Sequence, residues 1–208
     1  MRMFILDNGH GCDTPGKRSP IWEDGSYLQE WKYCRGIINR IAKDLKQHKI
    51  PCHILVPEDN DIPLRVRVQR ANRIAAQNGI AQTLLLSVHL NAAHDINVGS
   101  GWEVHTSLGE TMSDEYARIF WETAKEIIGD RFPMRGDFED GNPDRDSSFA
   151  IIRDTACPAI ITENLFMNTE KDCRFLMSPE GEQAIIDIHV HLRCRLRHHP
   201  GSQNLERM

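Results

Sequence analysis

Short apolar runs alternate along the chain with longer segments whose apolar residues recur every three or four positions. The short runs predict strands, and the longer segments predict amphipathic helices. The predicted strands are 3–6, 52–56, 83–88, 102–106 and 159–162. The predicted helices are 28–47, 64–78, 115–128 and 180–197. Strands that alternate with helices indicate an α/β fold, with a mostly parallel central sheet and helices on both faces.

The chain has a length that suits one domain, and no repeat or linker divides its 208 residues. We therefore expect a single domain over 1–208, with about the last ten residues forming a disordered tail. The segment 131–148 is rich in Gly, Pro and Asp. This composition predicts a long surface loop.

Charge and composition exclude several classes of function. The net charge is -5, and no cluster of Lys and Arg precedes the last few residues, so we expect no nucleic-acid partner. No stretch approaches the ~20 apolar residues of a membrane span. The apolar run that follows Arg2 is too short for a secretory signal peptide, so we expect synthesis in the cytoplasm. The six cysteines show no CxxC pair and are expected to be reduced.

Three polar residues lie at the carboxyl ends of predicted strands. His10 follows the first strand, His89 follows the third, and Glu163 follows the last. In open α/β sheets, ligands bind outside the carboxyl ends of the strands. Each residue alone has an ordinary structural explanation, such as a turn, a core histidine or a cap. Two imidazoles and a carboxylate at one edge together indicate a metal hydrolase.

A catalytic zinc ion needs about three protein ligands and an open position for water. Glu30 is the best candidate for the third ligand, because the helical spacing places it on the same face as Cys34, Ile38 and Ile41. A carboxylate on the buried face of a helix is costly unless it is paired or bound to metal. Glu23, in a polar loop, remains the alternative.

Further motifs carry a family resemblance. The chain contains DNGHG at 7–11, RVQRAN at 67–72, SVHLNA at 87–92, GWEV at 101–104 and PAIITENLFMN at 158–168. With Glu30 at the start of the first long helix, this set and its order resemble the zinc-dependent N-acetylmuramoyl-L-alanine amidases of the amidase-3 type. The resemblance covers about residues 3–190.

The resemblance implies a role for each candidate residue. His10, Glu30 and His89 would be the ligands of Zn²⁺, and Glu163 would be the catalytic carboxylate. The enzyme would hydrolyse the amide between the lactyl group of N-acetylmuramic acid and the L-alanine of the peptidoglycan stem peptide. Asn91 and His105 are candidates for contact with substrate.

Other interpretations stay open at this point. The same site would serve a zinc peptidase that cuts within the stem peptide, and the fold could also belong to a non-catalytic peptidoglycan-binding domain. The segments 11–27 and 131–148 depart from the family pattern, and the first of them would border the site. We expect a monomer that acts at the cell wall or in the periplasm, after phage-type release or after removal of an export signal.

Overall fold

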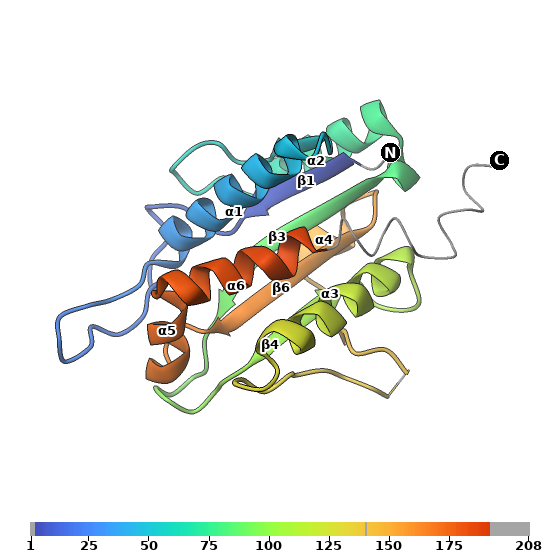
Figure 1. Cartoon of the computed structure of the whole chain (residues 1–208). Helices are drawn as coiled ribbons and strands as arrows, with labels where there is room; N and C mark the ends of the chain where they lie inside the picture. Colours follow the sequence, from blue (N-terminus) through green and yellow to red (C-terminus); the bar gives the residue numbers. More distant parts are fainter. Residues whose placement is uncertain (1–2, 140, 192–208) are drawn as a thin grey trace.

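The computed structural model describes residues 3–139 and 141–191, which form a six-stranded sheet in the order β2-β1-β3-β6-β4-β5 (Figure 1). The strands are β1 (Met3–Asn8), β2 (Cys52–Ile54), β3 (Thr83–Asn91), β4 (Trp102–Thr106), β5 (Arg145–Asp146) and β6 (Ala159–Phe166). β1, β2, β3 and β6 are parallel, whereas β4 runs antiparallel to β6. The mostly parallel sheet that the sequence predicts is confirmed.

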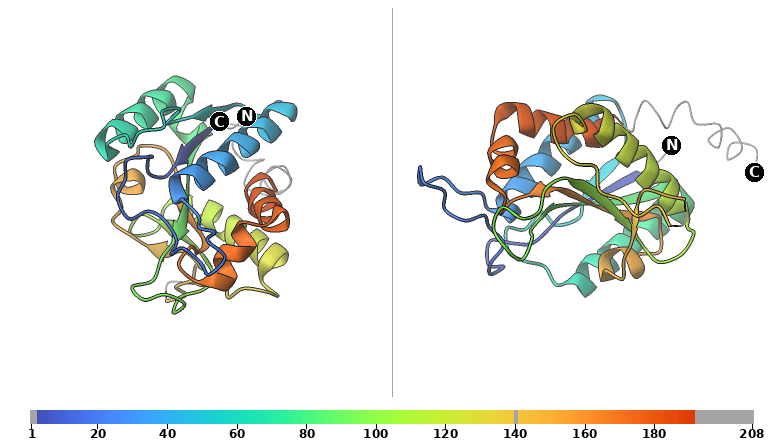
Figure 2. Two further views of the ribbon diagram at one scale, coloured as in Figure 1. Left: turned by 90° about the vertical axis from the view of Figure 1, so that its left-hand side faces the viewer. Right: turned by 90° about the horizontal axis from the view of Figure 1, so that it is seen from below.

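Helices cover both faces of this sheet (Figure 2). They are α1 (Glu30–Gln47), α2 (Leu64–Asn78), α3 (Met112–Ile128), α4 (Ala150–Arg153), α5 (Glu170–Leu176) and α6 (Pro179–Val190), with a 3₁₀ turn at Ile80–Gln82. α1, α3 and α6 pack on one face, and α2 and α4 on the other. The expected single α/β domain with helices on both faces is therefore confirmed.

β3 shows why its sequence is a continuous apolar run. Leu84 and Leu86 belong to the core under α1, α3 and α6, whereas Leu85 belongs to the core under α2. A strand that is buried on both faces has no polar side to alternate with. The odd-numbered residues of β3, including His89, thus lie on the face that α2 and α4 partly cover.

Several element boundaries differ from the predicted ones. β3 and β6 continue to Asn91 and Phe166, so His89 and Glu163 lie inside strands and not after them. Each of these two strands was predicted to end where a polar side chain follows the apolar run. Backbone pairing does not depend on side-chain polarity, so the strands continue. The predicted loop 131–148 contains β5, which is too short for any pattern to reveal. The predicted helix 180–197 begins at Pro179 and its described part ends at Val190; its last residues and the expected tail lie outside the described residues.

A bulge lies between β3 and β6 at the end of their pairing. His89 pairs with Glu163 and Asn91 pairs with Phe166, so two residues of β6 oppose one of β3. Leu165 takes the extra position with φ 64°, a conformation that is uncommon for a residue with a side chain. The bulge places both Asn164 and Leu165 toward the α1 core, where Trp102 Nε1 donates to Asn164 Oδ1. Such bulges re-aim side chains beside functional sites.

Within the described residues, no helix is both long enough and apolar enough to cross a bilayer.

A buried ion pair joins β1 to α2. Arg67 donates from Nη1 to Asp7 Oδ1 at 2.8 Å, and Ser87 Oγ donates to the other carboxylate oxygen at 2.6 Å. Arg67 also donates to the carbonyl oxygens of Asn8 and His10. Both charged side chains are almost fully buried, so the carboxylate of Asp7 depends on Arg67 for compensation, whereas Arg67 also pairs with Asp61 at 2.9 Å.

Replacing Arg67 by Ala leaves the carboxylate of Asp7 buried without its cation. We expect the free energy of unfolding to fall by about 3–5 kcal/mol. Urea denaturation followed by circular dichroism measures this loss. Arg70→Ala is the matched control on the same helix, because its pair with Glu58 is partly exposed and should contribute less than about 1 kcal/mol. Equal losses in the two variants would contradict the role of Arg67.

Candidate metal and catalytic site

His10 lies two residues beyond β1, in a left-handed backbone conformation with φ 61°. Its carbonyl oxygen accepts hydrogen bonds from Arg67 Nη2 at 3.2 Å and from Arg35 Nη1 at 3.1 Å. Two guanidinium groups thus hold a backbone conformation that few residues with a side chain adopt. The turn brings the imidazole of His10 edge-on to that of His89, with ring centroids 5.0 Å apart.

Glu30 is the first residue of α1 and is fully buried. Its Oε1 atom accepts a hydrogen bond from the backbone N–H of Leu90 at 3.1 Å. The same oxygen lies 3.4 Å from Nε2 of His10 and 3.2 Å from Nδ1 of His89. Burial raises the pKa of Glu30, but its interactions with the two histidines outweigh this effect and hold the pKa well below its usual range. Glu30 is therefore ionised at neutral pH.

His89 is the complementary partner of this carboxylate. Burial lowers the pKa of its imidazole, but the hydrogen bond to Glu30 and the charges of Glu163 and Glu30 raise it above its usual value. Gly9 makes room for the ring, because a Cβ at this position would lie 2.2 Å from Cε1 of His89. Gly11 packs against the backbone of Asp61. A Cβ at position 11 would lie 1.9 Å from the backbone nitrogen of Asp61. The two glycines of the DNGHG motif thus serve close packing.

The three ligand-type side chains fit a zinc ion. One ligand atom from each of His10, Glu30 and His89 lies within 4.8 Å of the others. The separations of 3.4 and 3.2 Å are close to the ~3.3 Å between ligands of a tetrahedral zinc ion with bonds of ~2.0–2.1 Å. Oε2 of Glu30 is buried with no hydrogen-bond partner in the described part of the chain, which is costly in a metal-free protein. Glu23, the alternative ligand, is exposed and lies outside this group.

Glu163 lies beside this group, in register with His89 on the neighbouring strand. Its Oε2 atom is buried, and no described residue forms a hydrogen bond with it. Burial raises the pKa of Glu163 to about 7; His89 opposes this shift, and the carboxylates of Glu30 and Glu103 add to it. A carboxyl group with a pKa near neutrality can both accept and donate a proton.

Asn91 and His105, the expected substrate contacts, both bind Glu103. Asn91 Nδ2 donates to Oε1 of Glu103 at 2.7 Å, and Nε2 of His105 lies 3.3 Å from the same oxygen. Glu103 pairs with Glu163 across β4 and β6, so its side chain lies on the same face of the sheet. Contact with substrate through Asn91 or His105 stays a prediction.

The sequence analysis did not identify two residues, Glu103 and Lys17, as neighbours of the site. Glu103 occurs in the GWEV motif, and the alternation of buried apolar residues around it was the only available signal. Lys17 comes from the segment 11–27, and its charge lowers the pKa of Glu163. The backbone carbonyl of Lys17 also accepts from the N–H of Glu30 at 3.1 Å. This segment therefore borders the site, as its position in the sequence led us to expect.

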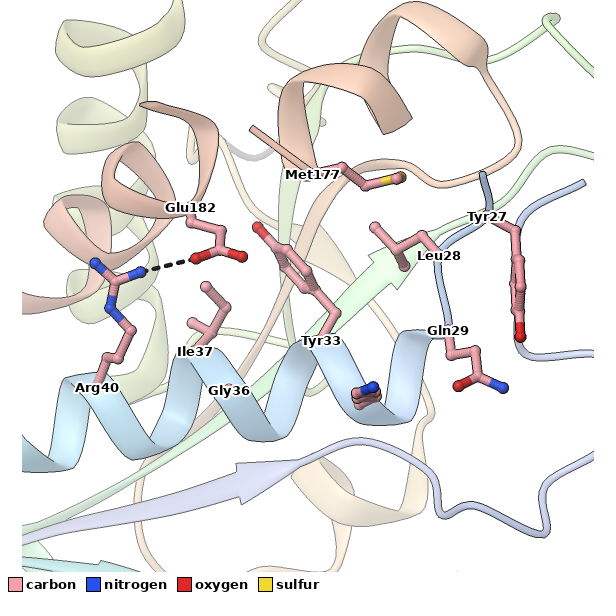
Figure 3. Close-up of a pocket in the computed structure, with 10 residues that line it drawn as sticks. Tyr27, Leu28, Gln29, Tyr33, Gly36, Ile37, Arg40, Met177 and Glu182 are labelled. Atoms are coloured by element: carbon pink, nitrogen blue, oxygen red, sulfur yellow. Dashed lines mark hydrogen bonds and ion pairs between the residues drawn. The ribbon is translucent and has the colours of Figure 1, made fainter. Parts of the chain in front are cut away.

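A separate cavity of ≈ 510 Å³ lies outside this site, between α1 and α6 (Figure 3). Tyr33, Ile37 and Arg40 extend into it from α1, and Arg40 pairs with Glu182 of α6 at 2.9 Å. None of the candidate metal ligands lines this cavity, and neither does Glu163. We assign it no part in the chemistry.

Known proteins resemble this chain over most of its length. Residues 4–190 match the amidase-3 family, which is described as N-acetylmuramoyl-L-alanine amidase, and the match confirms the resemblance of the motifs. The chain is similar to the N-acetylmuramoyl-L-alanine amidase CwlM of Bacillus licheniformis, with 25% identity over 193 residues (91% of this chain and 66% of the relative). It is also similar to an endolysin of Bacillus phage SPP1, with 24% identity over 199 residues (91% and 64%). The chain thus spans slightly less than two thirds of the length of these relatives.

Solved structures share the fold. The N-acetylmuramoyl-L-alanine amidase from Clostridium difficile 630 superposes with a TM-score of 0.79 at 21% sequence identity. The superposition covers 96% of this chain and 98% of that chain. At this identity the likeness supports the architecture of the sheet and its helices.

Gly9→Ala tests the packing of the His89 ring. The added methyl group must displace the imidazole, so we expect the free energy of unfolding to fall by about 1–3 kcal/mol. Urea denaturation measures the change. Gly36→Ala is the control, because this exposed helical glycine has open space around its Cβ position and alanine should stabilise α1 by about 0.5–1 kcal/mol. A neutral Gly9→Ala variant would show that the contact is not tight.

Proposed function

Because this chain belongs to the amidase-3 family of N-acetylmuramoyl-L-alanine amidases, we propose that it hydrolyses the amide between N-acetylmuramic acid and L-alanine in peptidoglycan. The observation that carries this proposal is the convergence of His10, Glu30 and His89 beside the buried carboxyl of Glu163. All four groups come from one chain, so the proposed site needs no partner subunit, and we propose that the enzyme acts as a monomer.

The proposed metal ligands are His10 Nε2, Glu30 and His89 Nδ1. Two neutral imidazoles and one carboxylate form a ligand set that zinc favours. When bound, zinc supplies Lewis acidity, which activates water for attack on an amide and stabilises negative charge on the carbonyl oxygen. The N–H of Leu90 and the helix position of Glu30 fix the direction of the carboxylate, so this ligand is oriented before any ion binds.

Glu163 is the proposed general acid and base. Its Oε2 atom has no hydrogen-bond partner within residues 3–139 and 141–191, so it is available to take the proton of the attacking water. The proton then passes from the same carboxyl to the leaving nitrogen of L-alanine, which departs as a neutral amine. Burial keeps the pKa of Glu163 near that required for both steps at neutral pH.

The proposed place of action is the cell wall. The similar proteins include a bacterial amidase and a phage endolysin, so both wall remodelling and phage lysis remain within the proposal.

Digestion of purified peptidoglycan, followed by mass spectrometry of the products, tests the proposed function. We expect stem peptides that begin with a free L-alanine amine, whose release stops when zinc is chelated and resumes when zinc is returned. Cleavage within the stem peptide would instead identify a peptidase. A folded, zinc-loaded protein that releases nothing would be a peptidoglycan-binding domain.

Zinc binding should depend on the proposed ligands. We expect one zinc ion per wild-type chain and an affinity loss of more than about 100-fold in His10→Ala and His89→Ala, since even residues behind the ligands contribute 10–100-fold. Calorimetric titration and metal analysis measure both quantities. His94→Ala is the control, because His94 is exposed and pairs only with Asp95 among the described residues. Unchanged binding in the first two variants would exclude this site.

Glu163→Gln should separate metal binding from chemistry. The amide cannot accept the proton of water, so we expect kcat to fall by at least about 100-fold while zinc affinity stays near that of the wild type. Turnover of soluble muropeptides and zinc titration provide the two readouts. Turnover close to normal would rule out the proposed proton transfer.

A further inference from the structure

We propose that Arg135 and Arg145 form a subsite that binds a carboxylate of the substrate peptide on the leaving-group side of the scissile amide. This inference rests on the proposed function and adds a preference among its substrates. Both arginines belong to the Gly-, Pro- and Asp-rich segment 131–148. The ligand is a peptide that begins at L-alanine and carries a free carboxylate on one of its next residues.

The register of the sheet places both arginines on the face that carries Glu163. Glu103 pairs with Glu163 across β4 and β6, and Arg145 pairs with His105 across β4 and β5. Alternate residues of β4 share a face, so Glu103 and His105 point to the same side. Arg135 reaches this side from the segment that hydrogen-bonds to Trp102, and its Nε atom donates to Oε2 of Glu103 at 2.7 Å.

The two guanidinium groups share a single carboxylate. Nη1 of Arg145 lies 3.8 Å from the same Oε2 atom of Glu103 that Arg135 binds. Oε1 of Glu103 is already occupied by Asn91 and His105. Burial raises the pKa of Glu103, but the hydrogen bonds of its carboxylate with His105 and Arg135 outweigh this effect and lower the pKa to about 2. Glu103 therefore carries one full negative charge. Glu103 thus offsets one of the two positive charges of Arg135 and Arg145.

Both arginines also have unused donors. Among residues 3–139 and 141–191, no acceptor takes a hydrogen bond from the Nη atoms of Arg135 or from any guanidinium nitrogen of Arg145. Their side chains are 38% and 41% exposed. The guanidinium of Arg135 lies over the ring of Phe166, 5.1 Å from its centroid, which limits its freedom before a ligand arrives. A planar guanidinium with free Nη atoms matches the geometry of a carboxylate.

The distance from the site fixes which part of the peptide could be bound. β4 and β5 lie about 5 and 10 Å from β6 at the usual strand spacing of ~4.8 Å. An extended peptide advances about 3.3–3.6 Å per residue. A peptide that leaves Glu163 across these strands therefore brings its second or third residue to the arginines. The carboxylate that they bind belongs to one of those residues.

The test compares two soluble muropeptides that differ only in having a carboxylate or a carboxamide at that position. We expect the zinc-loaded wild type to favour the acid, and Arg135→Gln and Arg145→Gln each to lower the acid-to-amide ratio of kcat/KM about tenfold, mainly through the KM for the acid. The preference should weaken at high salt. Arg131→Gln is the matched control, because Arg131 begins the same segment but pairs with Glu180 of α6. Its ratio should equal that of the wild type.

Outcomes for the subsite and for the amidase activity are separable. A ratio that neither Arg135→Gln nor Arg145→Gln changes, or an equal loss with both substrates, would overturn the subsite and leave the arginines as structural partners of Glu103. If one variant does not fold, the other carries the same test. If no substrate is hydrolysed, calorimetric binding of the free acid and amide peptides to the zinc-loaded chain decides. A preference for the acid that Arg135→Gln abolishes would support the subsite alone, and equal binding would overturn it.

Discussion

The site depends on how buried carboxyl groups at one edge of the sheet are stabilised, and Asp7, Glu30 and Glu163 show three different ways. Burying a carboxylate costs several kcal/mol unless a partner compensates it. Asp7 has Arg67 as an internal cation. Glu30 lies between two imidazoles, and one of its oxygens has no partner among the described residues. Within the same part of the chain Glu163 has no cation in hydrogen-bond contact, and burial raises its pKa to about 7. The cost of burial is thus met in three ways: Asp7 forms a structural ion pair, Glu30 is placed as a metal-type ligand, and Glu163 has a raised pKa that suits proton transfer.

The structural pair and the chemical site are physically connected. Arg67 binds Asp7 and also the carbonyl oxygen of His10, whose backbone is held in a left-handed conformation. The position of the His10 ring therefore depends on an ion pair that takes no part in the proposed chemistry. Gly9 applies a second constraint, since only a residue without Cβ lets the His89 ring approach this turn. These contacts give a physical reason for Asp7, Gly9 and His10 in the DNGHG segment.

The sequence predicted the sheet, its long helices and the convergence of His10, Glu30, His89 and Glu163. It could do so because the carboxyl ends of parallel strands share an edge, and because helical spacing shows that Glu30 faces inward. The bulge at Leu165 could not be predicted, since its cost is compensated by packing between residues far apart in the chain. The cluster around Glu103 was also beyond prediction. It depends on how the segment 131–148 pairs with β4, and a strand of two residues leaves no periodic pattern.

Basic side chains lie at the edge of the site, although the whole chain has a net charge of -5. The charge of Lys17 acts on the carboxyl of Glu163, and Arg135 and Arg145 lie beside that of Glu103. Lys17 comes from the segment 11–27 and the arginines from 131–148. In the proposed subsite these side chains attract an anionic peptide, and the charge of Lys17 also lowers the pKa of Glu163. His10, Glu30, His89 and Glu163 would thus supply the chemistry, and the two segments would select the peptide that receives it.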